Sequence, residues 1–211
     1  FDLDGINPLN TLAIVVAAGP EARIVPAVAG LPDALFEHDG QITKREIRAM
    51  TLSALAPRRG ELLWDVGAGS GSIGIEWMLA DRSLRAIAIE ADPERAARAA
   101  RNAAPLGVPD LHVVNGRAPE ALAGLDPPDA IFIGGGGGDD ALLDAAIAAL
   151  RERGRLVVNA VTLASEAALL ACHGALGGEL TRITLARAAP LGGETGWRPA
   201  MPLTQWTWTK P

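Results

Sequence analysis

The sequence predicts a doubly wound α/β domain whose sheet is mostly parallel, with one antiparallel strand in a C-terminal hairpin. Two patterns carry this prediction. Short apolar runs alternate with alanine-rich helical runs through the middle of the chain, and the last apolar runs follow one another without a helical segment between them. Alternating strands and helices indicate a parallel sheet covered on both faces. Two successive strands joined by a loop indicate a hairpin, and hence an antiparallel strand.

The individual elements follow from capping residues, periodicity and breakers. Thr43 and Glu46 match the S/T-x-x-E capping box, so a helix is expected to begin at Thr43 and to end before Pro57 and Gly60. The expected strands are Leu62–Val66, Leu84–Glu90, Leu111–Val114, Asp129–Ile133, Arg155–Val158, Glu179–Ala186 and Leu203–Thr209, and the expected helices are Ile73–Ala80, Pro93–Ala104, Pro119–Leu122, Asp139–Leu150 and Leu163–Leu176.

The first 40 residues have a different texture from the rest. They contain repeated prolines and one strand-like run, Leu12–Val16, which is typical of a linker or arm. The opening segment also looks like the tail of something larger. We therefore expect residues 1–40 to connect an upstream domain to the α/β domain at residues 41–211.

Composition limits the function classes. The net charge is −6 and the pI is about 5.1, so no overall positive field favours nucleic acid. Apolar runs are too short to cross a bilayer, which needs about 18 residues or more. The single cysteine, Cys172, excludes an internal disulfide and a cysteine-cluster metal site. We expect a cytoplasmic protein without a metal centre that binds neither nucleic acid nor membrane.

A glycine-rich turn follows the first predicted strand and opens a helix. It reads Asp65-Val66-Gly67-Ala68-Gly69-Ser70-Gly71, and Glu90 ends the next strand about 20 residues later. Glycines allow a sharp turn and close approach of a ligand, and an acid after the second strand accepts hydrogen bonds from ribose hydroxyls. The spacing Asp-x-Gly-x-Gly-x-Gly favours S-adenosylmethionine and a Rossmann-like class I methyltransferase sheet.

A second interpretation of the same glycines is a nicotinamide-binding domain, because Gly69-Ser70-Gly71-Ser72-Ile73-Gly74 also satisfies G-x-G-x-x-G. The strand is expected to end at Val66, which puts the tight turn at Gly67 instead of Gly69. The closing antiparallel hairpin is also foreign to a standard dinucleotide-binding half. Both features favour the methyltransferase.

Four further segments resemble the precorrin (cobalt-precorrin) carbon-15 methyltransferase family of cobalamin biosynthesis, and they occur in the family's order from about residue 32 to the C-terminus. They are Phe36–Arg48, Gly116–Leu122, the glycine run Ile133–Gly138 and Val158–Leu163. The segments Asn7–Asn10 and Gly30–Asp33 resemble the junction where this domain is fused behind a carbon-5 tetrapyrrole methylase. The resemblance implies S-adenosylmethionine-dependent methylation at carbon 15 of a precorrin, with decarboxylation of the carbon-12 acetate, in a homotetramer.

The resemblance also suggests site residues. It places the cofactor, and its product S-adenosylhomocysteine, at Thr43, Gly67, Ala68, Gly69, Ser70, Gly71, Glu90 and Ala118. A polyanionic tetrapyrrole needs cations, and the candidates are Lys44, Arg45, Arg48, Arg117 and Arg198; Gly135 and Gly136 would let the flat macrocycle approach. His38 or Asp39 is a candidate proton donor, and Trp197 is a candidate for the substrate cleft or an interface.

Other functions remain open at this stage. A methyltransferase of the same fold acting on RNA or protein is disfavoured by the acidic charge, and a nicotinamide-binding oxidoreductase domain by the glycine placement. A non-catalytic assembly domain with a relic pocket is disfavoured by the intact Gly67–Gly71 turn together with Glu90.

Overall fold

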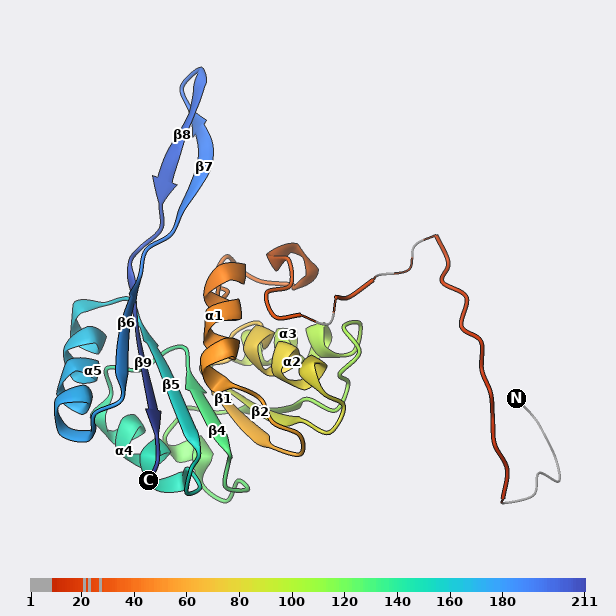
Figure 1. Ribbon diagram of the computed structural model, residues 1–211, viewed down its shortest axis with the longest axis horizontal. Coiled ribbons are helices and arrows are strands. Elements are labelled where there is room, and N and C mark those ends of the chain that lie inside the picture. Colours follow the sequence, from red (N-terminus) through yellow and green to blue (C-terminus); the bar gives the residue numbers. More distant parts are fainter. Residues whose placement is uncertain (1–8, 21, 23, 27) are drawn as a thin grey trace.

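The computed structural model describes residues 9–20, 22, 24–26 and 28–211 (Figure 1). Its centre is a seven-stranded sheet with the order β3-β2-β1-β4-β5-β9-β6. Strands β1 to β5 pair in parallel, whereas β9 is antiparallel to both of its neighbours, β5 and β6. The strands are β1 (Leu62–Val66), β2 (Arg85–Glu90), β3 (His112–Asn115), β4 (Ala130–Ile133), β5 (Arg155–Ala160), β6 (Glu179–Ile183) and β9 (Leu203–Thr209).

Helices cover both faces of this sheet, as two separate hydrophobic clusters show. One cluster joins the sheet to α1 (Arg45–Leu55), α2 (Ser72–Ala80) and α3 (Pro93–Ala103), and the other joins it to α4 (Asp140–Ala149) and α5 (Leu163–Leu176). Short 3₁₀ turns occur at η1 (Asp33–Leu35) and η2 (Glu120–Leu122). The tryptophans expected in the core are buried there: Trp64, Trp77, Trp206 and Trp208.

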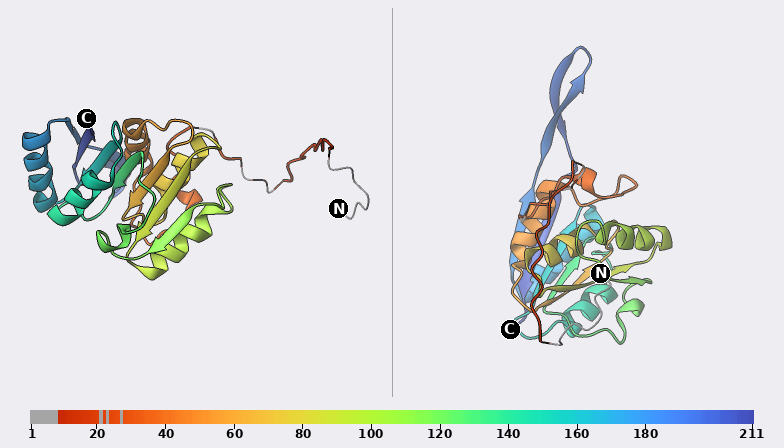
Figure 2. Two further views of the ribbon diagram at one scale, coloured as in Figure 1. Left: turned by 90° about the horizontal axis from the view of Figure 1, so that it is seen from below. Right: turned by 90° about the vertical axis from the view of Figure 1, so that its right-hand side faces the viewer.

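The fold class predicted from the sequence is confirmed, including the antiparallel strand. The expected strands and helices all occur, most with ends shifted by one or two residues. The main difference is at residues 186–199, which the sequence analysis treated as the end of a strand and a loop. They form a two-stranded ribbon of β7 (Ala186–Leu191) and β8 (Glu194–Pro199), and the right-hand view in Figure 2 shows this ribbon standing clear of the sheet. Both strands are largely exposed and have no apolar face, so periodicity could not reveal them.

The N-terminal part also differs from expectation. Leu12–Val16 forms no strand; it is extended and solvent-exposed, with Val15 at 97%. By contrast, Leu31 and Phe36, which the prediction assigned to the arm, are buried in the core beside α1 and α2. The packed α/β body therefore includes residues before position 41.

Candidate active site

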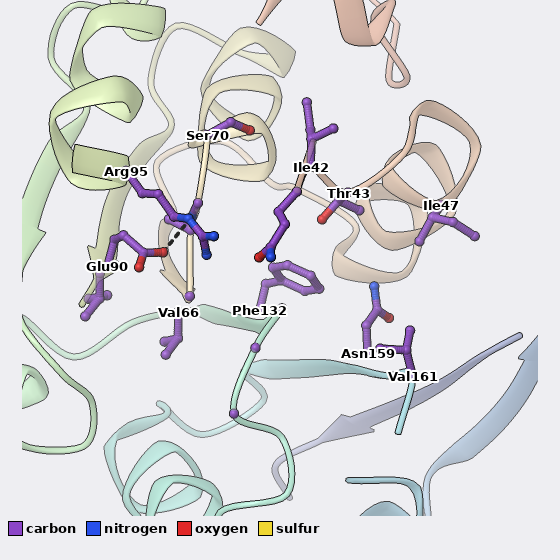
Figure 3. A pocket seen from close by; sticks show the side chains of 18 of the residues that line it. Ile42, Thr43, Ile47, Val66, Ser70, Glu90, Arg95, Phe132, Asn159 and Val161 are labelled. Atoms are coloured by element: carbon purple, nitrogen blue, oxygen red, sulfur yellow. Dashed lines mark hydrogen bonds between the residues drawn. The ribbon is translucent and has the colours of Figure 1, made fainter. Parts of the chain in front are cut away.

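A cavity of about 810 Å³ opens at the carboxyl ends of β1, β4 and β5. The strand order reverses between β1 and β4, which is the place where open α/β sheets bind ligands. Its volume lies in the range of small-molecule sites. Figure 3 shows side chains from the loop after β1, from the segment before α1 and from the ends of β4 and β5 around a common space.

The glycine loop after β1 requires glycine at more than one position. Gly67, Gly69 and Gly71 have φ angles of +72°, +57° and +74°. A Cβ on Gly67 would lie 3.0 Å from the backbone nitrogen of Gly135, and one on Gly71 would lie 2.9 Å from Cβ of Ala99. Gly67, Ala68, Gly69 and Ser70 line the cavity, whereas Gly71 packs against α3. Gly71 therefore has a packing role, and cofactor binding by the loop residues stays a prediction.

Glu90 lies on the cavity wall at the end of β2 and is fixed by backbone donors. The backbone N–H of Gly69 donates to Oε2 over 2.8 Å, and that of Asp92 donates to Oε1 over 2.9 Å. The side chain is 7% exposed and lies beside Val66 and Arg95 in Figure 3. Each oxygen keeps a lone pair that can accept from a ligand hydroxyl. Glu90 thus presents two fixed carboxylate oxygens beside glycine backbone. This arrangement is suited to accepting hydrogen bonds from the ribose hydroxyls of a nucleoside.

Asp65, the acid that precedes the loop, has a different environment. It is fully buried behind the loop, where its Oδ2 accepts from the Gly74 backbone over 2.9 Å. Its Oδ1 has no partner in the described part of the chain. Burial, with a smaller contribution from the nearby Glu90 carboxylate, raises the pKa of Asp65 to about 7 despite the hydrogen bond from Gly74. This carboxyl supports the loop from inside the core.

Thr43 lines the cavity, but its expected capping role is wrong. Helix α1 begins at Arg45 with Lys44 as the N-cap residue, and no side chain makes a cap hydrogen bond there. The chain enters the helix later than the capping-box pattern predicted, and Arg48 donates to the carbonyl oxygen of Thr43. The Thr43 side chain is thereby released from the capping role. Ala118, the last of the predicted cofactor positions, also lines the cavity.

The predicted substrate-binding cations lie in three different environments. Lys44 and Arg117 line the cavity, whereas Arg45 lies on the exposed side of α1 and Arg198 on the exposed ribbon. Arg48 is wrong as a substrate residue because it is completely buried. It forms ion pairs with Glu76 and Asp33 and lies 4.8 Å above the Phe36 ring.

The glycine run after β4 lines the cavity with its first three glycines only. Gly134, Gly135 and Gly136 line the cavity, which agrees with the positions proposed for macrocycle approach. Gly137 and Gly138 face protein instead: a Cβ would lie 2.8 Å from Val158 and 3.2 Å from Ser165, respectively.

The two proton-donor candidates do not lie among the described residues that line the cavity. His38 is exposed, and its Nδ1 accepts from the Gly40 backbone. The backbone N–H of Gln41, followed by Arg95 and Arg98, holds the pKa of Asp39 well below its usual range. A carboxyl that remains ionised in this way is a poor acid, so the structure argues against Asp39 as proton donor.

Several cavity residues were missed by the sequence analysis. Phe132 lies near the end of β4, Arg95 lies on α3 and Asn159 lies near the end of β5. The signal that could have identified Phe132 and Asn159 is their place at the carboxyl ends of parallel strands. Trp197, considered for the substrate cleft, is 77% exposed on β8 and does not line the cavity. Within the described residues no group of three His, Cys, Asp or Glu could hold a metal ion, and no helix is long and apolar enough to span a membrane.

The strand order, the glycine loop after β1 and the acid after β2 together define a class I methyltransferase fold. The chain belongs to the family described as "Precorrin methyltransferase domain", whose family model matches residues 34–210. This result favours the methyltransferase interpretation of the glycine loop over the nicotinamide one.

Individual relatives agree with this family. The chain is 67% identical over its whole length to a Sinorhizobium precorrin-6Y C(5,15)-methyltransferase [decarboxylating], and it spans 51% of that protein. It is 40% identical over 79% of its length to a probable cobalt-precorrin-6B C(15)-methyltransferase (decarboxylating) of Pyrobaculum calidifontis, of which it covers 88%. The crystal structure of the C-terminal domain of precorrin-6Y C5,15-methyltransferase from Rhodobacter capsulatus superposes with a TM-score of 0.83 at 49% identity, covering 88% of this chain and all of that one. The chain thus spans about half the length of the first of these relatives.

Proposed function

We propose that this domain uses S-adenosylmethionine to methylate carbon 15 of a precorrin and promotes decarboxylation of the carbon-12 acetate. The observation that carries the proposal is the Glu90 carboxylate, held by Gly69 and Asp92 at the edge of the cavity of a precorrin methyltransferase domain. Relatives that the chain matches over most of their length are named for methylation at the same carbon with decarboxylation.

The polar groups and the bare backbone that line the cavity support this cofactor. Glu90 would accept the ribose hydroxyls, and Gly67–Gly69 would lie against the cofactor with bare backbone. Gly116–Ala118 and Thr43 line neighbouring parts of the same wall. Bound S-adenosylmethionine supplies an electrophilic methyl group, and S-adenosylhomocysteine is its product. The chain contributes position and orientation, which can account for much of the rate of such a transfer.

The substrate proposal rests on cations and apolar side chains that line the same cavity. Lys44, Arg95 and Arg117 line the cavity of a chain that carries a net charge of −6. These groups match the carboxylates of a tetrapyrrole side chain. The segments from β6 to β9 add apolar side chains against which the macrocycle would lie. When the carboxylate leaves as carbon dioxide, the electron pair of the broken C–C bond passes into the conjugated macrocycle of the substrate itself.

Three further features belong to the same proposal. A carbon-5 methylase domain precedes this domain in the parent chain, as the length of the Sinorhizobium relative suggests. The domain assembles as a homotetramer, for which the exposed ribbon with Leu191 and Trp197 is the contact we favour. The protein acts in the cytoplasm, consistent with its single cysteine.

The test is calorimetric titration of the purified chain with S-adenosylhomocysteine, with NADH as the control ligand. We expect micromolar binding, and Glu90→Ala should weaken it by about tenfold or more, which is about 1.4 kcal/mol. Glu94→Ala, a change of the same type on the exposed first turn of α3, is the matched control and should bind like the parent chain. If the chain binds NADH in place of S-adenosylhomocysteine, or binds neither ligand, the cofactor assignment is wrong and the proposed function fails with it.

A further inference from the structure

Asn159 has an unusual place in the cavity wall. The glycine loop and Glu90, which we assign to the cofactor, form one part of the cavity wall. The segments from β5 to β9 form a second part, which is left to bind the methyl acceptor. In that second part Asn159 is the one polar side chain among the described residues. The others are apolar: Val161, Ile183, Leu185, Ala200, Met201 and Leu203. Figure 3 shows the amide of Asn159 directed into the space that it shares with Phe132 and Ile47.

The Asn159 amide is held by two buried side chains. Its Nδ2 donates to Oγ1 of Thr51 on α1 over 3.0 Å, and its Oδ1 accepts from Nε2 of Gln205 on β9 over 2.9 Å. Gln205 Nε2 also donates to Thr51 Oγ1 over 3.2 Å, which closes the triangle. Thr51 is 0% exposed and Gln205 is 4% exposed.

This triangle sets the orientation of the amide. Gln205 Nε2 donates one hydrogen to Thr51 and the other to Asn159, so Asn159 presents its oxygen to Gln205 and its nitrogen to Thr51. One N–H of Asn159 then remains without a partner in the described part of the chain. A flipped amide would place two N–H groups against each other, so the unused donor is fixed in direction. The antiparallel β9, an addition to the parallel sheet, supplies the residue that fixes it.

We propose that Asn159 orients the methyl acceptor by donating this N–H to a carboxylate oxygen of the tetrapyrrole, and that Thr51 and Gln205 are positioning residues. The substrate is rich in acceptors and poor in donors, so the nitrogen end of the amide is the complementary one. Thr51 and Gln205 are buried in the layer between α1 and the sheet, where apolar side chains are usual. Polar side chains at these two positions are explained if they serve to hold the Asn159 amide. This inference rests on the proposed function, since it requires a tetrapyrrole acceptor in the cavity.

The experiment compares variants of the chain in methyl transfer from S-adenosylmethionine to the precorrin acceptor, with S-adenosylhomocysteine affinity measured separately. Asn159→Leu should lower kcat/KM for the acceptor by about tenfold or more, the effect of one hydrogen bond to a charged group, with cofactor affinity unchanged. Asn159→Asp should raise the acceptor KM further than Asn159→Leu, because its negative charge repels the substrate carboxylate.

The positioning role has its own matched pair. Thr51→Val removes the hydroxyl that holds Nδ2 and should lower kcat/KM, whereas Thr51→Ser keeps the hydroxyl and should restore it. Thr204 is buried next to Gln205 on β9, but its hydroxyl donates to Glu166 on α5. Thr204→Val is therefore the control for a lost buried hydrogen bond, and its kcat/KM should equal that of the parent chain.

Four outcomes separate this inference from the proposed function. If Asn159→Leu keeps the parent kcat and KM, or if it loses S-adenosylhomocysteine binding, the inference is wrong while the proposed function stands. Equal activity of Thr51→Val and Thr51→Ser would overturn the positioning role. A parent chain that binds S-adenosylhomocysteine but does not methylate the precorrin would instead remove the proposed function.

Discussion

Asp65 shows at the scale of a single residue how the glycine loop and the stability of the domain are connected. The carboxyl is fully buried, one oxygen accepts from Gly74 and the other has no partner in the described part of the chain. Its pKa rises from 3.8 to about 7 because ionisation in this environment is unfavourable.

The shift predicts a specific pH dependence. Because the folded-state pKa lies above the unfolded value, the native state holds the proton longer, and the free energy of unfolding should fall as the pH rises from about 4 to about 7. Above that range the loss is complete and should amount to a few kcal/mol. Asp65→Asn keeps an acceptor for Gly74 and removes the charge, so its advantage over the parent chain should grow through the same window.

Urea unfolding of the two ligand-free chains measures the difference between their free energies of unfolding. Measurements at about pH 5 and about pH 8 span most of the expected change in this difference. Other titrating groups are common to both proteins and cancel in the comparison. Parallel stability curves for the two chains would show that Asp65 does not titrate in this range.

At the scale of elements, the buried Arg48 joins three segments that lie apart in the sequence. Its guanidinium contacts Glu76 on α2, Asp33 in η1 and the carbonyl oxygens of Leu31 and Thr43. Glu76 in turn accepts from the Gly30 and Leu31 backbones over 2.6 and 2.9 Å. The cluster therefore attaches the segment before α1 to the body and fixes the carbonyl of a residue in the cavity wall.

Removing one member of this cluster should be costly. Arg48→Met leaves Glu76 buried and unpaired, and we expect the free energy of unfolding to fall by about 3–5 kcal/mol. Adding Glu76→Gln removes the orphaned charge, so the double variant should recover part of the loss. Urea denaturation of both variants provides the measurement. If Arg48→Met lowers the free energy of unfolding by less than about 1 kcal/mol, the buried ion pair contributes no more than a surface ion pair does.

At the scale of the whole molecule, the β7–β8 ribbon has no role in closing the sheet. Its base is closed by the Ala200 N–H, which donates to the Leu185 carbonyl over 2.8 Å, and beyond that point both strands are largely exposed. Leu191 is 70% exposed and Trp197 is 77% exposed. These two apolar side chains are the ones that a partner subunit would cover if the ribbon forms the proposed contact.

Replacing residues 186–199 by an Asn-Gly turn tests the tetramer. Leu185 and Ala200 are already adjacent, so a two-residue turn can join them. We expect the parent chain to elute as a tetramer and the shortened chain as a smaller species in size-exclusion chromatography with light scattering. Unchanged S-adenosylhomocysteine binding controls for folding, and a shortened chain that remains tetrameric would place the contact elsewhere.

Local patterns in the amino-acid sequence were sufficient to predict the fold class and to identify the glycine loop and Glu90, which line the same cavity. Alternation of apolar and helical runs is a local property, as are the glycines after β1 and the acid that ends β2. The glycine loop and Glu90 could therefore be located from the order of residues alone. The predicted strands from Leu62 to Val158 required little correction for the same reason.

Which polar residues face the cavity depends instead on how distant elements pack. Arg48 was a candidate substrate-binding cation and is buried, while Arg198 lies on a ribbon that no periodicity revealed. Asn159, Thr51 and Gln205 lie 46 to 154 positions apart in the chain and meet only because β9 inserts beside β5. The direction of a side chain is set by this long-range packing, and no short stretch of the chain encodes it.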